Sequence, residues 1–99
     1  MTPPPADRSQ LDAAVKLHHA GRVEEAAAAY RAILRQSPDD ADALHLLGVT
    51  HLQAAQPGEA AGLIERALSV RPNVAVYHLN LAAASLALRR IDDAIEHAE

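Results

Sequence analysis

Histidine is the residue type in this sequence best able to bind a metal ion, and the 99 residues include six of them. They are His18, His19, His45, His51, His78 and His97. A zinc site needs three or four ligands that converge on the ion, and two ligands on one helix are usually four residues apart. The first two histidines are adjacent and the next two are six residues apart, so neither pair would share one helix face. The spacing predicts histidines at or near the surface and no metal site.

Residues that could carry out a reaction show no catalytic arrangement either. The four glycines are scattered and form no phosphate-binding loop, and the serines show no nucleophile elbow. The adjacent acids at 39–40 and 92–93 lie at predicted turns, where helix capping explains them. The absence of Cys excludes disulfides and thiolate metal sites. We therefore expect no enzyme activity and no cofactor in these residues.

The composition points to closely packed helices. Hydrophobic residues make up 49% of the chain but aromatic residues only 2%, and Ala, with 23 residues, accounts for much of the difference. Ala is the best helix former and fills little core volume, whereas sheets favour β-branched and aromatic residues. We therefore expect an all-α fold in which small residues let helices approach closely.

Charge and hydropathy narrow the choice of partners. The formal net charge is −4, and the basic residues form no stripe that would bind nucleic acid or an anionic membrane. No apolar run approaches the roughly 20 residues of a membrane span, and residues 1–5 do not resemble a signal peptide. These features favour a cytoplasmic protein that binds neither nucleic acid nor membranes.

A period of 34 residues organises the sequence, and each period contains two helices. Pro38 and Pro72 lie one period apart, each after an apolar stretch. We expect helices over 9–20, 23–36, 41–54, from the turn at 56–59 to about 70, and over 74–88. Arg89 and Arg90 are expected to form the next turn, and Ile91 to begin a sixth helix.

Small residues recur where the two helices of a hairpin must approach closely. The expected contacts are Ala14 with Ala26, Gly48 with Ala60, and Ala82 with Ala94. These positions, the two prolines and the stretch 41–49 resemble the tetratricopeptide repeat family. The resemblance implies a right-handed superhelix, or solenoid, of antiparallel helix hairpins. It divides the chain into a disordered Pro-rich N-terminus at 1–6, repeats at 7–40 and 41–74, and a truncated third repeat at 75–99.

The resemblance also implies a concave groove, lined by the first helix of each repeat, that binds a peptide or partner protein. The groove residues it assigns are Asp12, Val15, His19, Asp42, His45, Val49, Gln53, Asn80 and Ala83. Chaperone-binding members hold a carboxylate with Lys, Asn and Arg, but those positions here are Leu11, Val15, Leu46, Val76 and Asn80, which argues against such a clamp. Asn80 resembles the asparagines that bond a bound peptide backbone in some members; the alternative is a solvated polar residue.

The sequence therefore predicts a protein-protein interaction module with an unknown protein or peptide partner. Two alternatives stay open. The repeats could target substrates for a larger bacterial glycosyltransferase or sulfotransferase-like enzyme, or they could be a self-assembly segment. Because no capping helix follows the third repeat, we also expect a homodimer through its open apolar face. The residues expected on that face are Leu81, Leu88, Ile91 and Ile95.

Overall fold

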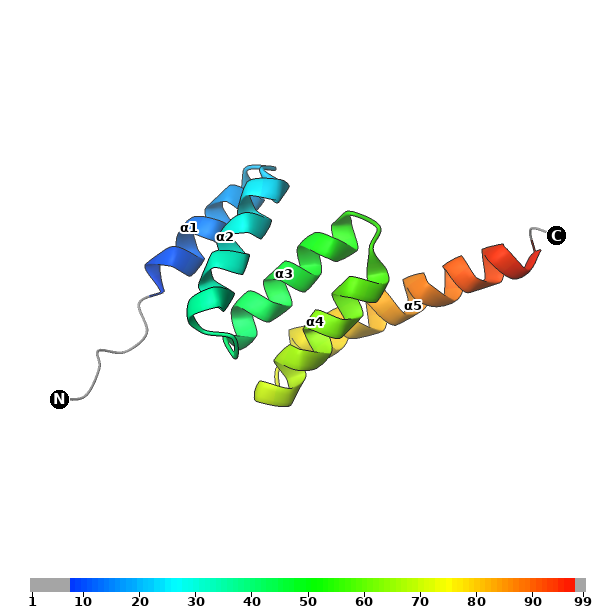
Figure 1. The fold of residues 1–99 in the computed structure, drawn as a ribbon. Helices are drawn as coiled ribbons and strands as arrows, with labels where there is room; N and C mark the ends of the chain where they lie inside the picture. The colour runs from blue at the N-terminus through cyan, green and yellow to red at the C-terminus, as the bar shows by residue number, and fades with distance from the viewer. Residues whose placement is uncertain (1–7, 98–99) are drawn as a thin grey trace.

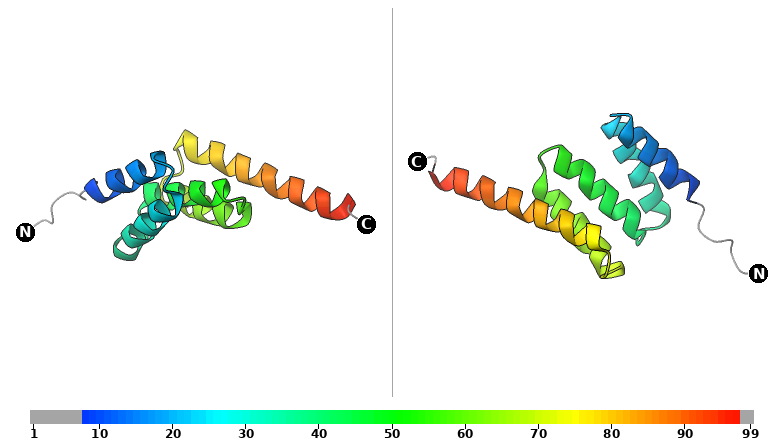
Figure 2. Two further views of the ribbon diagram at one scale, coloured as in Figure 1. Left: turned by 90° about the horizontal axis from the view of Figure 1, so that it is seen from above. Right: turned by 180° about the vertical axis from the view of Figure 1, so that it is seen from behind.

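Five helices in two layers make up the described part of the chain (Figure 1). The computed structural model describes residues 8–97, with side chains as far as residue 93, so the N-terminus expected at 1–6 lies outside the described residues. The helices are α1 (Ser9–His19), α2 (Val23–Gln36), α3 (Ala41–Gln53), α4 (Pro57–Val70) and α5 (Ala75–His97). The rear view of Figure 2 shows α1, α3 and α5 in the nearer layer, with α2 and α4 behind them. The predicted all-α class of helical repeats is confirmed.

The turns inside the first two hairpins have the same backbone geometry one period apart. Gly21 and Ala55 both have a positive φ, 81° and 59° respectively. The backbone amide of Arg22 donates to the Leu17 carbonyl at 2.9 Å, and 34 residues later that of Gln56 donates to a carbonyl at 2.8 Å. Each first helix therefore ends on a left-handed residue, which glycine adopts freely and alanine adopts at a cost.

Two buried clusters hold the layers together, and each contains one of the two tyrosines. Ala14, Ala26 and Tyr30 lie in the first cluster, and Ile64 and Tyr77 lie in the second. All five are at most 1% exposed. Because the other buried residues are mostly small, the tyrosine rings supply much of the core volume.

Two helices approach closely at Gly48, where α3 crosses α4. A Cβ atom at this position would lie 2.8 Å from Cγ1 of Ile64 and 3.2 Å from the carbonyl oxygen of Ala60. Both distances are shorter than ordinary van der Waals contacts. The small residue at this place in the 34-residue period is therefore required by the distance between the helices.

The turn predicted at Arg89 and Arg90 is wrong, because α5 continues through it without a break. Arg89 lies one period after Ala55 and two after Gly21, but the segment after Pro72 contains neither Gly nor Pro to end a helix. Arginine is a good helix former, so the local preference favours continuation. The chain consequently has one long helix where the period predicts a third hairpin.

This continuation changes the contacts expected for the third repeat. Ala82 and Ala94 belong to one helix and are about 18 Å apart along its axis, so they form no crossing. Ala82 is exposed. The expected apolar face is partly covered, because Leu81 and Leu88 are half-buried and Leu81 packs against the second cluster, whereas Ile91 is 43% exposed. The side chains of Ala94 and Ile95 lie outside the described residues.

Candidate functional site

A hollow of about 350 Å³ opens on the layer formed by the first helices. It is lined by Val15, His18, His19, Tyr30, His45, Leu46, Val49, Gln53 and Asn80, and we call it the groove hollow. Tyr30 comes from α2, Asn80 from α5, and the others from α1 and α3. The lining contains no lysine, arginine, aspartate or glutamate, so the hollow favours neutral groups.

A chain of hydrogen bonds joins α1 to its neighbours at one side of the groove hollow. Nε2 of His18 lies 2.6 Å from Oε1 of Gln53 and therefore donates to it. In the neutral imidazole Nδ1 then accepts a bond from the Tyr30 hydroxyl, at 3.2 Å. Burial raises the pKa of Tyr30, so its hydroxyl stays protonated. These bonds fix the tautomer of His18 and connect the first repeat to the second.

His45 is the buried polar residue of the groove hollow, with 6% of its surface exposed. Nδ2 of Asn80 donates to its Nε2 at 2.7 Å, which places the imidazole proton on Nδ1. Its ring packs on Tyr77, with the centroids 4.6 Å apart and the planes tilted by 33°. Burial lowers the pKa of His45. The residue is therefore a neutral acceptor that positions Asn80 at the hollow.

An ionic network borders this face at the N-terminal ends of α1, α3 and α5. Arg8 lies 2.8 Å from Asp40 and 3.3 Å from Asp42, and Arg71 lies 3.6 Å from Asp42. The Tyr77 hydroxyl donates to Asp42 at 2.5 Å. Burial, and then this bond to a carboxylate, raise the pKa of Tyr77 to about 12. Asp42 thus contacts residues of the repeats before and after it and helps to hold successive repeats together.

Asp40 has a second role, because it caps α3. Its Oδ1 accepts the backbone amide of Ala43 at 3.1 Å, which satisfies one of the free donors at the helix start. Burial alone would raise the pKa of Asp40, but the bonds from Arg8 and from Ala43 outweigh it and lower the pKa below the usual value. Asp40 is therefore ionised whenever the chain is folded near neutral pH.

Three of these bonds share one spacing. His18 and Gln53, Asp42 and Tyr77, and His45 and Asn80 are each 35 residues apart, which is one period plus one residue. Each pair joins neighbouring first helices. Two of the three pairs, His18 with Gln53 and His45 with Asn80, line the groove hollow, so these residues also connect each repeat to the next.

The structure brings together most of the groove residues expected from the sequence. Val15, His19, His45, Val49, Gln53 and Asn80 line the groove hollow. Asp42 belongs to the ionic network, and Asp12 is exposed on α1 and does not line the hollow. Ala83 instead lines a second hollow of about 340 Å³ between α5 and the α3–α4 turn.

Of the lining residues absent from the predicted set (His18, Tyr30 and Leu46), Tyr30 is the one outside the first helices. It lies in α2, and the prediction assigned the groove to first helices alone. One signal was available: a buried tyrosine hydroxyl needs a hydrogen-bond partner, and His18 and His19 were the polar side chains nearest in the opposite helix of the hairpin.

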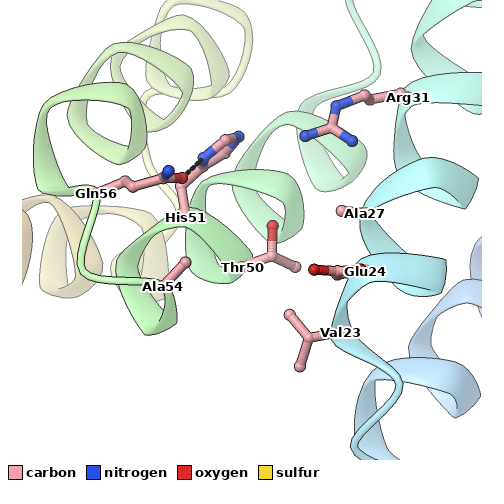
Figure 3. A pocket seen from close by; sticks show the side chains of 8 residues that line it. All are labelled: Val23, Glu24, Ala27, Arg31, Thr50, His51, Ala54 and Gln56. Atoms are coloured by element: carbon pink, nitrogen blue, oxygen red, sulfur yellow. Dashed lines mark hydrogen bonds between the residues drawn. The ribbon is translucent and has the colours of Figure 1, made fainter.

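A third hollow of about 390 Å³ lies between α2 and α3 and shares no residue with the groove hollow. Figure 3 shows Glu24 and Arg31 of α2 on one wall and Thr50 and His51 of α3 on the other. His51 donates through Nδ1 to Oε1 of Gln56 at 2.7 Å. The sequence predicted no site here, because these residues belong to two different repeats.

The described residues show two further negative findings. Among residues 8–93, no three His, Asp or Glu side chains are placed to hold a metal ion. In the same part of the chain, no helix has the length and apolar character that crossing a membrane requires. The groove hollow offers hydrogen-bonding groups and apolar surface.

Comparison with known proteins gives one result for the fold. A family model described as tetratricopeptide repeat matches residues 17–78, from the end of α1 to the beginning of α5. No curated protein matches the chain.

Proposed function

Because this chain belongs to the tetratricopeptide repeat family, we propose that it is a protein-protein interaction module that binds an extended peptide segment of its partner in the groove hollow. The family supports the general role in protein binding. The site and the kind of ligand are argued from the residues that line the hollow.

The observation that carries the proposal is the combination of apolar and neutral polar groups in one concavity. Val15, Leu46 and Val49 are half-buried and offer an apolar surface. His19 and Gln53 are exposed beside them and can bond a peptide backbone. Since the lining carries no formal charge, we expect a segment with small or branched apolar side chains rather than a strongly charged one.

The test begins with peptides selected from a random library against the 99-residue chain, whose affinities are then measured by fluorescence anisotropy. Val49→Glu places a charge among the apolar residues and is expected to weaken binding at least about tenfold. His19→Ala, at an exposed position, is expected to weaken it about threefold without affecting the fold.

Val70→Glu is the matched control, because Val70 is exposed on α4 and outside the groove hollow. Circular dichroism shows whether each variant keeps its helices. Selected peptides that bind both groove variants as well as the unchanged chain would show that the hollow is not the binding site.

A further inference from the structure

Helix α5 carries apolar side chains on two opposite sides. Tyr77 and Ala84 on its inner side are at most 1% exposed, and Tyr77 belongs to the second buried cluster. Leu79 and Leu86 on the other side are 68% and 51% exposed. In the described chain the exposed large hydrophobic residues are Val70, Val76, Leu79, Leu86 and Ile91, and all but the first lie on α5. This helix therefore exposes more apolar surface than the rest of the fold.

Two of the exposed leucines form one stripe with two alanines. At about 100° per residue, Leu79, Ala82, Ala83 and Leu86 fall on the same side of the helix. Both alanines are exposed. We call these four residues the outer stripe. An apolar stripe of this kind on a surface helix normally packs against another element.

Part of the outer stripe, at Ala82, is open because α5 does not turn back on itself. Ala82 occupies the place of Ala14 and Gly48 in the period, and those two residues are buried against the second helix of their hairpins. Figure 2 shows α5 extending past the second hairpin as a single straight rod. None of the helices described in residues 8–97 buries the stripe, although Ala83 and Leu86 also line the second hollow beside the α3–α4 turn.

We propose that a second copy of this chain covers the outer stripe, with the two α5 helices packed antiparallel about a two-fold axis between Ala82 and Ala83. The argument is the symmetry of the stripe, which reads Leu-x-x-Ala-Ala-x-x-Leu in both directions. A two-fold interface requires a self-complementary surface. In this register Leu79 faces Leu86 of the second copy, and the alanines meet at the crossing.

The side chains suit such a crossing. Small residues at the centre let two helices approach closely, and leucines on either side fill the space beside them. The charges agree with the antiparallel direction. Asp93, on the same side of the helix, would lie beside the N-terminal end of the other α5, where the helix dipole is positive and Arg71 is exposed. A parallel pair would instead place Asp93 against its own copy.

Sedimentation velocity of the 99-residue chain from about 5 to 500 µM tests the association. We expect a concentration-dependent dimer that the double variant Leu79→Glu and Leu86→Glu weakens at least about twentyfold. Both leucines are exposed, so the helix content should not change. Val70→Glu, the exposed hydrophobic residue outside α5, is the matched control and should dimerise like the unchanged chain. A strict monomer over this range, or a double variant that still dimerises, would overturn the proposal.

Single cysteines test the direction, because the natural sequence contains none. A mixture of Leu79→Cys and Leu86→Cys chains should form a disulfide-linked dimer under mild oxidation, whereas neither chain alone should. Efficient linkage of either chain with itself would refute the antiparallel register. The Val49→Glu groove variant should dimerise normally. Sedimentation therefore tests the dimer independently of the peptide-binding measurements, and either proposal can fail without the other.

Discussion

Replacing Gly48 by alanine tests the close crossing of α3 and α4 with a single added carbon. The new Cβ would lie 2.8 Å from Cγ1 of Ile64 and 3.2 Å from the carbonyl oxygen of Ala60. Neither neighbour moves easily, because Ile64 is 0% exposed and the carbonyl belongs to the backbone of α4. The two helices must therefore separate slightly.

Two opposing effects set the magnitude. Alanine is a better helix former than glycine by about 1 kcal/mol. Forcing an extra carbon into a packed interface costs about 1–3 kcal/mol. We expect a net loss of about 1 kcal/mol in the free energy of unfolding, which lowers the midpoint temperature by about 4–8 °C for a chain of this size.

Gly62→Ala is the matched control for helix propensity. Gly62 also lies inside a helix, but a Cβ there would meet nothing within 4 Å. This variant should gain about 0.5–1 kcal/mol, so the two Gly→Ala changes should have opposite signs in urea and thermal unfolding followed by circular dichroism.

A double-mutant cycle with Ile64→Ala locates the clash. The truncation removes the atom closest to the new Cβ, so the Gly48→Ala change should cost less in that background by about 1 kcal/mol. If Gly48→Ala stabilises the chain as much as Gly62→Ala does, the close crossing of α3 and α4 is refuted.

Three further predictions concern the turn and the polar side chains. Ala55→Gly should raise the free energy of unfolding by about 1 kcal/mol, because glycine adopts the positive φ of 59° without strain; a lower melting temperature would contradict this. Tyr77→Phe should cost about 1–2 kcal/mol in urea unfolding, since Asp42 loses a bonded hydroxyl, and an unchanged midpoint would show that the bond contributes nothing. Stability should be lost as pH falls below about 6.5, because burial lowers the pKa of His45 and the unfolded chain takes up the proton first. The urea midpoint of the His45→Gln variant should therefore depend less on pH than that of the unchanged chain. If the two chains show the same pH dependence, other groups cause the effect.

The helix hairpins could be predicted because the period repeats the residues that end helices. Pro38 and Pro72 follow α2 and α4, and Gly21 occupies the left-handed position after α1. The second hairpin turn was expected from Pro57 and its neighbours, but its left-handed residue is Ala55, which no local preference identifies. Tertiary packing of α3 on α4 holds it there.

The period alone could not decide whether the helix breaks at Arg89 or continues. Arg89 occupies the turn position, and only the packing of a following helix could force a good helix former to leave the helix. Most residues of the groove hollow could be predicted, because side chains such as His45 and Asn80 lie on first helices at a constant spacing. The hydrogen bond between these two side chains could not be predicted, since the offset of 35 residues depends on how neighbouring helices stack.

The bonds spaced 35 residues apart have a consequence for how this chain loses order. Because each connects one repeat only to the next, the molecule behaves as a short row of units with nearest-neighbour coupling. We therefore expect opening to start at the ends and amide hydrogen exchange to be slowest in α3, the helix bonded on both sides. If a peptide binds in the groove hollow as proposed, it would touch α1, α3 and α5 together, and its binding energy would add to the coupling between repeats. Recognition would thereby convert a row that frays into a single cooperative unit.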